Sequence, residues 1–229
     1  MVSSLLRKYA LPGVSLLLAA CSERVTAPVE YVNFAQPFPG RVADMAAFPA
    51  RHRGVYTAPD SVTSLCIGRT AVWLQEPRST TFGPQLAGSR PLPADTSFRA
   101  EDGRMHYLRR FAKDSVRESW LWTDTIFTLG GPGAGRLRRF QGHYYLSTSN
   151  ESAENWQVQR LAIASGHVTW QTLGQDTLRL RALEPATLVR RQSEGLTYYR
   201  LTPGLGPQTR RLGRYAGLWE TEGEFERRR

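Results

Sequence analysis

The sequence is poor in cysteine, lysine and histidine, and these shortages exclude several classes of protein. Its 229 residues include two Cys and four His, and arginine supplies 28 of the 30 basic residues. Two cysteines exclude a disulfide-stapled small domain and a Cys-rich zinc module. A hydrophobic share of 41% and an aromatic share of 10% exclude wholesale disorder and can fill a core at this chain length.

Long apolar runs are also missing, and the one short run lies at the N-terminus. Arg7 and Lys8 precede a mostly apolar stretch over residues 9–18, which a Pro and a Gly interrupt. Such a stretch is too short to cross about 30 Å of hydrocarbon, so a transmembrane helix is disfavoured. A positive start, a short apolar stretch and small residues predict a signal peptide over residues 1–20.

The end of this segment, Leu18-Ala19-Ala20-Cys21, resembles a bacterial lipobox. The resemblance implies cleavage before Cys21 and acylation of that cysteine, with palmitate-like chains. Several acyl chains anchor a protein stably, because each buried methylene contributes about 0.8 kcal/mol. Cleavage removes two positive charges from the net charge of +10, which leaves +8. Ser22, in place of an acid, resembles lipoproteins of the outer membrane. We therefore predict a lipid-anchored protein of the bacterial cell envelope, on the outer membrane, facing the periplasm or the surface.

Residues 21–47 carry scattered Pro and few periodic apolar positions, so we predict a lipidated tether there. After cleavage Cys66 is the only cysteine with a free thiol, which excludes an internal disulfide. It lies in Leu65-Cys66-Ile67, whose composition is typical of a strand. We predict that Cys66 is a small buried hydrophobic residue and not a reactive thiol.

From Gly54 onward, short β-prone runs alternate with turn residues, and no long window keeps a helical apolar stripe. The pattern predicts an all-β protein with little helix. Asp102-Gly103 predicts a hairpin turn within Ala100–Arg104. In residues 177–181 apolar and polar side chains alternate, which predicts one strand. Four Asp-Ser or Asp-Thr steps predict turns before strands: Asp60-Ser61, Asp114-Ser115, Asp124-Thr125 and Asp176-Thr177.

Two stretches resemble copies of one another. Each opens with a Gly-x-Tyr step, continues through a Leu-x-Ile run and ends in a run that carries Trp. The first copy contains Gly54-Val55-Tyr56, Leu65-Cys66-Ile67 and Val72-Trp73, and the second contains Gly142-His143-Tyr144, Leu161-Ala162-Ile163 and Val168-Thr169-Trp170. Chance similarity between β-rich segments is the alternative explanation.

Two architectures fit this pattern. The first is a sandwich-like pair of related, packed antiparallel halves, over residues 48–130 and 136–229, the second ending in a polar basic tail. The glycine-rich segment Gly130–Gly135 would connect them. The second is a lipocalin-like barrel, which the Gly-x-aromatic opening resembles and which can hold an apolar ligand. We favour the packed halves.

The residues that carry chemistry form no recognisable catalytic or metal pattern. The four histidines are far apart in the sequence, so no ready metal face is predicted: His52, His106, His143 and His167. Glu101 and Asp102 fall at a hairpin tip, and Glu220 to Glu226 fall in the predicted polar tail. We therefore predict no catalytic residue, no metal and no cofactor, and leave an envelope hydrolase as a minor hypothesis.

The excess of arginine is the remaining functional signal, and several of these arginines are adjacent in the sequence. The pairs and the terminal run are Arg109-Arg110, Arg138-Arg139, Arg190-Arg191, Arg210-Arg211 and Arg227 to Arg229. Such a surface suits phosphate groups of lipid, an anionic glycan or a protein partner. We expect no nucleic-acid partner, because the chain has no nucleic-acid reader motif and because it carries an export signal. A GC-rich genome is the compositional alternative.

Several short motifs together resemble a family of uncharacterised predicted lipoproteins from Bacteroidetes. They are Phe48-Pro49, Arg53 to Tyr56, Phe140 to Ser147 and Trp156 to Val158. An acidic stretch after the lipid-bearing cysteine is usual in surface-exported members and is missing here. The resemblance implies a lipoprotein without a known activity. We predict a non-enzymatic binding or structural scaffold, with a barrel-type carrier of a lipophilic ligand as the alternative.

Overall fold

The computed structural model describes residues 30–60, 62–83, 96–112, 115–130, 135–149, 155–174, 188–193, 196–202 and 206–228. Within these ranges the protein is all-β with one α-helix, as the sequence predicted. The signal peptide, Cys21, the turn at Asp114, the turn at Asp176 and the alternation over 177–181 lie outside the described residues.

The described connections between elements are short, except for the segment of residues 35–49. In chain order they are β1 (Glu30–Phe34), η1 (Ala50–His52), β2 (Gly54–Thr57), β3 (Ser64–Ile67), β4 (Ala71–Phe82), β5 (Thr96–Arg99), β6 (Met105–Ala112), β7 (Ser115–Thr128), β8 (Arg136–Phe140), β9 (His143–Ser149), β10 (Trp156–Ala164), β11 (His167–Leu173), β12 (Leu188–Ser193), β13 (Leu196–Leu201), α2 (Gly206–Arg214), η3 (Ala216–Leu218) and β14 (Trp219–Arg227).

All fourteen of these strands belong to one sheet, whose main path runs β12-β13-β1-β10-β11-β14-β2-β3-β4-β7-β6-β5. Strand β9 also pairs with β10 and carries β8 on its other side. Every pairing between them is antiparallel except that of β1 with β13. The path ends at β12 and at β5 without closing, so the lipocalin-like barrel is wrong.

The two sequence copies form two meanders with the same pairing register. In the first meander (β2, β3 and β4) Tyr56 lies opposite Leu65, and in the second (β9, β10 and β11) Tyr144 lies opposite Leu161. Likewise Ile67 pairs with Val72, and Ile163 pairs with Val168. The Tyr, Leu, Ile and Val positions of the two motifs therefore match in register. The tryptophans do not match, since Trp73 lies opposite Cys66 and Trp170 lies opposite Leu161.

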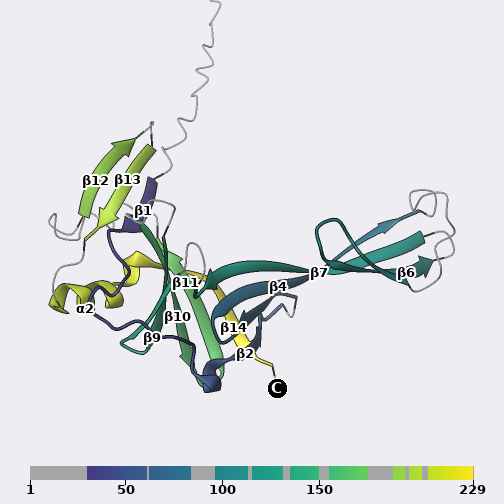
Figure 1. The fold of residues 1–229 in the computed structure, drawn as a ribbon, viewed down its shortest axis with the longest axis horizontal. Coiled ribbons are helices and arrows are strands. Elements are labelled where there is room, and N and C mark those ends of the chain that lie inside the picture. The colour runs from purple at the N-terminus through teal and green to yellow at the C-terminus, as the bar shows by residue number, and fades with distance from the viewer. Residues whose placement is uncertain are drawn as a thin grey trace, which may run out of the picture.

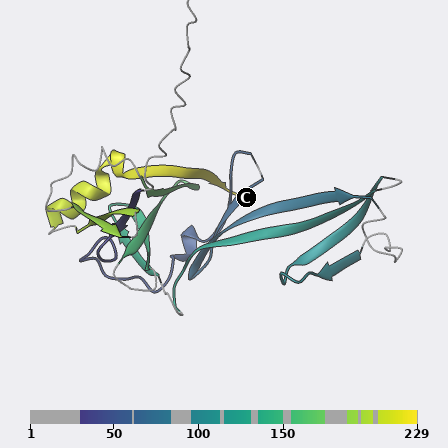
Figure 2. The same cartoon turned by 90° about the horizontal axis from the view of Figure 1, so that it is seen from above.

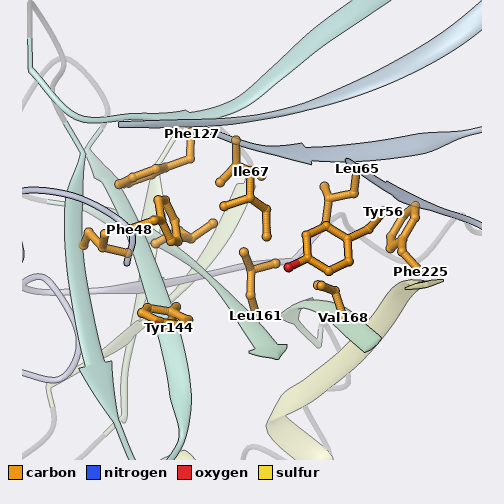
Figure 3. Close-up of a cluster of buried hydrophobic side chains, with 12 residues drawn as sticks. Phe48, Tyr56, Leu65, Ile67, Phe127, Tyr144, Leu161, Val168 and Phe225 are labelled. Atoms are coloured by element: carbon orange, nitrogen blue, oxygen red, sulfur yellow. The ribbon is translucent and has the colours of Figure 1, made fainter. Parts of the chain in front are cut away.

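The two meanders share one hydrophobic core, which we call the main core. Its fully buried members include Tyr56 and Leu65 from the first meander and Tyr144 and Leu161 from the second. Figure 3 shows these side chains pointing toward one another, with Phe127 and Phe48 above and beside them. This burial is the dominant favourable contribution to folding, at about 1.5–3 kcal/mol for each large apolar side chain.

A second core cluster corrects the predicted tether. Strand β1 begins at Glu30, and Phe34 and Phe38 are fully buried against Trp219 and the helix residue Leu212. The ring centroids of Phe34 and Phe38 lie 4.8 Å apart. From Glu30 onward the segment is thus part of the fold, because its aromatic residues bury more apolar surface than a solvated tether would.

The C-terminal segment is the second correction, since it is not a polar tail. Residues 219–227 form β14, which pairs with β11 on one side and with β2 on the other. Trp219 and Phe225 are buried while the glutamates between them are exposed. One sheet therefore continues across the predicted boundary between residues 130 and 136. The division into domains stays a prediction.

Asp124 is the third correction. It lies inside β7, opposite Leu74 of β4, and starts no strand. Asp60, in contrast, behaves as predicted, because its Oδ1 accepts hydrogen bonds from the backbone N–H groups of Val62 and Thr63 at 2.9 and 3.4 Å. An Asp followed by Ser or Thr suits both a turn and an exposed strand position, so this signal alone does not separate them.

Candidate binding arm

Strands β4 and β7 are long enough to leave the body of the molecule. The start of β4, at Val72, and the end of β7, at Phe127, lie in the main core. A bulge follows at Val72/Trp73. Beyond it the two strands stay paired as far as Phe82 and Val116. Figures 1 and 2 show this pair extending from the body and carrying β5 and β6 at its far end. We call the outer parts of β4 and β7, with β5 and β6, the arm.

The tip of the hairpin formed by β5 and β6 is the turn predicted from Asp102-Gly103, and it lies partway along the arm, on the side toward the body. Ala100 and Arg104 are joined by a backbone hydrogen bond of 2.9 Å, and Gly103 has a φ of 78°. Glycine adopts such a left-handed conformation without steric cost. Glu101 and Asp102 are exposed at this tip, as expected. The N–H of Arg104 donates to Asp102 and, with the guanidinium of the same residue, lowers the pKa of that carboxyl.

Strand pairing gives the arm two faces. In antiparallel pairs, directly opposite residues lie on the same face of the sheet. His106 pairs with Trp120 and with Phe98, and Glu76 pairs with Trp122. These residues define the tryptophan face. Tyr107 pairs with Ser119, and Pro77 pairs with Leu121, which defines the opposite face.

His106 is held in place on the tryptophan face. Its ring stacks on Trp120 at 5.0 Å with an interplanar angle of 8°. Nδ1 lies 2.6 Å from the Glu118 carboxylate, which accepts its hydrogen, and Nε2 lies 3.6 Å from Asp102. The residue is only 8% exposed. A histidine that is stacked and faced by carboxylates at both nitrogens supports the hairpin, and little of its ring is open to a substrate.

Arginines cover the other tryptophan of this face. The guanidinium carbons of Arg78 and Arg104 lie 4.4 and 4.0 Å from the centre of the Trp122 ring. Each arginine also pairs with a nearby acid, Arg78 with Glu76 and Arg104 with Asp102. The charges of Arg78 and Arg104 are therefore partnered within the arm.

The opposite face carries large apolar side chains that stay partly exposed. They are Met105, Tyr107, Phe111 and Leu121, which are 39%, 51%, 56% and 47% exposed. Soluble proteins scatter single apolar residues over the surface, but a contiguous group on one sheet face marks an interaction site. In this protein most of the large exposed apolar residues that are described gather on the arm.

Arginines on this face lack acidic neighbours within the described strands of the arm. Arg109 of β6 lies directly opposite Arg117 of β7, and Arg99 lies opposite Met105. Within the described parts of these four strands, the three acids, Glu76, Glu118 and Asp124, belong to the tryptophan face. We call the surface of Arg99, Met105, Tyr107, Arg109, Phe111, Arg117 and Leu121 the basic face.

Neutral groups partly compensate the arginine charges of the basic face. The Arg117 guanidinium lies 3.7 Å from the centre of the Phe111 ring, and Arg99 Nη1 donates to the carbonyl of Gly103 at 2.9 Å. Like charges directly opposite in a sheet are destabilising. The Arg109/Arg117 pair thus weakens the isolated arm and favours an anion placed over both residues.

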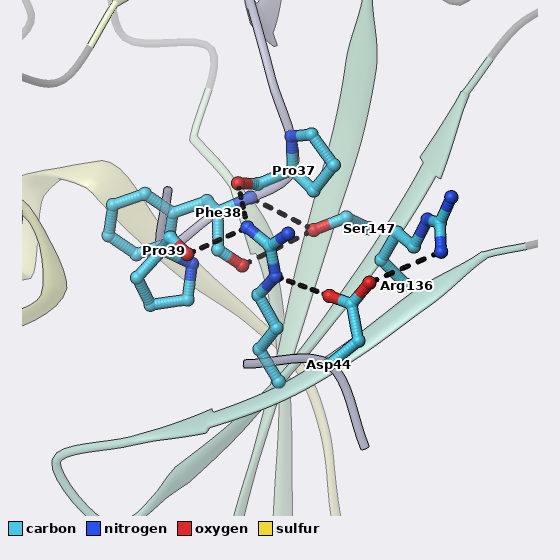
Figure 4. A network of polar contacts seen from close by, with 7 residues as sticks. Pro37, Phe38, Pro39, Asp44, Arg136 and Ser147 are labelled. Atoms are coloured by element: carbon cyan, nitrogen blue, oxygen red, sulfur yellow. Dashed lines mark hydrogen bonds and ion pairs between the residues drawn. The ribbon is translucent and has the colours of Figure 1, made fainter. Parts of the chain in front are cut away.

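Not every arginine of the predicted pairs faces solvent. Arg138 donates through Nε to Asp44 at 2.7 Å and through Nη1 to the carbonyls of Pro37 and Pro39 at 2.6 and 2.8 Å. Figure 4 shows this network, in which Arg136 binds the other carboxylate oxygen of Asp44. Arg138 thereby fixes the segment that follows β1 to the second meander.

Arg160 is buried near α2 and is also structural. It is 8% exposed and donates to Gln171 and to the carbonyl of Gly213, both at 2.6 Å. Its guanidinium carbon lies 4.4 Å from the Trp219 ring centre. Burial lowers the pKa of Arg160 and raises that of the neighbouring Tyr145 hydroxyl. The contacts join β10 to the helix.

The other predicted residues are not brought together into a site. His52 bonds to the Tyr144 hydroxyl at 2.8 Å, His143 donates to the Gln141 carbonyl, and His167 faces Glu226 at 3.7 Å. In the part of the chain that the structure describes, no group of three acids, histidines or cysteines could hold a metal ion. Sequence reasoning missed the contact of His106 with Glu118, because it depends on the pairing of β6 with β7.

Cys66 is where the sequence placed it, in β3 and 2% exposed. Its thiol donates to Gln75 Oε1 at 3.3 Å. Burial raises the pKa of the thiol above its ordinary value. These observations confirm that Cys66 is buried in the body, and its low reactivity stays a prediction.

Two surface hollows of the described structure are more polar than apolar. One of about 480 Å³ is open to solvent between β2 and β14, beside Thr57, Ser64, Glu226 and Arg228. Another of about 270 Å³ is lined by Asn33, Gln157, Thr172 and Glu222 among others. A lipophilic ligand needs a mostly apolar site that buries most of its surface. Neither hollow has that character, so neither favours the carrier.

Comparison with known proteins yields no relative: no protein family, curated protein or solved structure matches this chain. Among the described residues, no helix has the length and apolar character needed to cross a membrane.

Proposed function

We propose that this protein is a lipid-anchored protein of the bacterial cell envelope that acts as a non-enzymatic binding scaffold. In this proposal acyl chains on Cys21 hold the chain at the outer membrane. The body supports the arm, and the arm contacts the partner. The lipobox-like end of the signal segment supports the anchor.

The observation that carries the binding role is the position of the arm's apolar residues. Tyr107, Phe111 and Leu121 are about half exposed on strands that extend beyond both core clusters. A free-standing strand arm with two sets of apolar side chains gains little by folding alone, since among the described residues its faces pack on no second layer. Contact with a partner would complete the missing layer on the basic face.

In-cell photocrosslinking tests the binding role. Tyr107→p-benzoylphenylalanine in the full chain places the photoreactive group on the basic face. The same substitution at Val62, which is 45% exposed and lies off the arm, is the matched control. We expect a reproducible adduct from position 107 that position 62 does not form. Equal labelling from both positions, or none from position 107, would contradict a binding role for the arm.

Fractionation tests the anchor separately. Wild-type protein should sediment with membranes and show the mass of an acylated chain that begins at Cys21. Cys21→Ser should lose the acyl mass and shift toward the soluble fraction. An unmodified cysteine in the wild type would contradict the lipoprotein hypothesis and leave the crosslinking result standing.

A further inference from the structure

From the geometry of the basic face we infer that the arm binds the phosphate-bearing surface of an anionic lipid bilayer. This inference rests on the proposed binding role of the arm and names its partner. It concerns a site other than Cys21, so the protein would touch lipid at two places.

Charge is the first argument. Arg109 and Arg117 lie directly opposite each other, both are exposed, and no acid of the described arm shares their face. The residual repulsion between them disappears when a phosphate lies over both guanidinium groups. Arginine suits this ligand because its planar fork donates two parallel hydrogen bonds to phosphate oxygens.

The apolar residues supply the second argument, which separates lipid from a purely polar anion. Met105, Phe111 and Leu121 add apolar surface to the same face, and Tyr107 adds a ring with a polar end. Basic side chains beside aromatic and aliphatic ones suit the boundary between headgroups and acyl chains. A soluble polyanion would leave most of this apolar surface exposed to water.

Chain length is the third argument. Cys21 precedes Glu30 by nine residue positions, and a chain of that length reaches at most about 30 Å. A lipid on Cys21 would therefore keep β1, and with it the body, close to a bilayer. The arm would then meet its ligand without a search through solution, which strengthens weak binding through a high effective concentration.

Sedimentation with vesicles tests the inference. The full chain carrying Cys21→Ser is mixed with vesicles of phosphatidylcholine alone or of phosphatidylcholine with phosphatidylglycerol. Because the N-terminal segment is the same in all variants, differences between variants report the rest of the surface. We expect binding to the anionic vesicles to exceed binding to the neutral ones and to fall as salt is raised.

Matched charge variants locate the binding surface. Arg99→Gln/Arg109→Gln/Arg117→Gln should weaken binding to the anionic vesicles roughly a hundredfold, about fivefold for each arginine. The control Arg41→Gln/Arg69→Gln/Arg210→Gln removes the same charge from exposed positions off the arm and should change binding much less. Equal losses in both triple variants would show a mere net-charge effect and overturn the inference.

A fluorescent label reports whether the face meets the bilayer. An environment-sensitive dye on Leu121→Cys should shift to the blue with anionic vesicles, and the same dye on Val62→Cys should not. No shift at position 121, or an equal shift at both positions, overturns the inference. So does stronger competition by a soluble polyanion than by vesicles. Loss of vesicle binding with a protein adduct still formed from position 107 would reject the bilayer and keep the binding arm.

Discussion

The body and the arm are built from the same kind of antiparallel strands and differ in what covers their side chains. In the body, Tyr144 and Leu161 are fully buried by residues of the main core. In the arm, Tyr107 and Leu121 also lie in paired antiparallel strands, and they are 51% and 47% exposed. Strand pattern alone therefore does not decide whether an apolar residue stabilises the fold or is presented to a partner.

The same contrast holds for arginine. Arg138 and Arg160 of the body are fixed by carbonyls, an amide and a carboxylate, and their charges serve the fold. Arg109 and Arg117 of the arm face each other, and no acid of the described arm shares their face. We interpret the body as the stability-determining part and the arm as the recognition part of the molecule.

The sharpest test of this division is the same substitution made in both parts. Leu161→Ala removes a fully buried side chain from the main core and should lower the free energy of unfolding by about 2–5 kcal/mol. Leu121→Ala on the arm should change it by less than about 0.5 kcal/mol. Urea unfolding followed by fluorescence measures both. Similar losses would mean that the arm is part of the cooperative core.

A second matched pair concerns Asp44. Arg138→Met removes the donor to three acceptors from a side chain that is 12% exposed and should cost about 1–3 kcal/mol. Arg136→Met removes a contact to the same carboxylate from a side chain that is 55% exposed, and should cost less than about 1 kcal/mol. The two midpoints of thermal unfolding give the comparison, and equal shifts would contradict the anchoring role of Arg138.

Two turn glycines allow a comparison of the body and the arm with a smaller expected effect. Gly142 precedes β9 and Gly103 lies in the turn between β5 and β6 of the arm, and both have positive φ with open space where a Cβ would lie. Alanine at either position should introduce backbone strain of about 1 kcal/mol. For Gly142→Ala we expect the loss in global unfolding. For Gly103→Ala we expect faster amide exchange in β5 and β6 with little global change. Faster exchange across the body after Gly103→Ala would argue against this separation.

The smallest effect is expected at Cys66, whose thiol should react little with labelling reagents in the folded protein. Burial raises its pKa above the ordinary value of 9.0, so at pH 9 the folded thiol stays mostly protonated. Since the thiolate is the reactive form, a maleimide or iodoacetamide should label Cys66 slowly in native protein and quickly in urea. Labelling at the same rate in both states would show that β3 opens readily.

Local signals predicted several features of the body and one turn of the arm. The Asp102-Gly103 hairpin, the β-rich pattern and the burial of Cys66 each depend on neighbours in the sequence, and each is confirmed. The two similar stretches pair in the same register, because the Tyr, Leu and Val of each motif meet within one meander. Their shared core followed from the same apolar positions.

Features that depend on distant pairing could not be found in this way. Residues 219–227 look polar because their glutamates alternate with fewer apolar residues, yet β14 is paired on both sides. Phe34 and Phe38 gave no periodic signal, yet both are fully buried. The Asp102, His106 and Glu118 cluster required the register of β6 against β7.

By itself, the sequence determined that the described chain is all-β, with turns at Asp60 and Gly103 and a buried Cys66, because these follow from local backbone preference and apolar content. The same sequence carries the lipobox-like prediction at Cys21. Only the tertiary structure decided that the sheet stays open and that β4 and β7 carry an arm beyond the core. It also decided which arginines are anchored. The physical reason is that burial and charge compensation depend on which strands meet, and strands that meet here, such as β4 with β7 and β2 with β14, are distant in the chain.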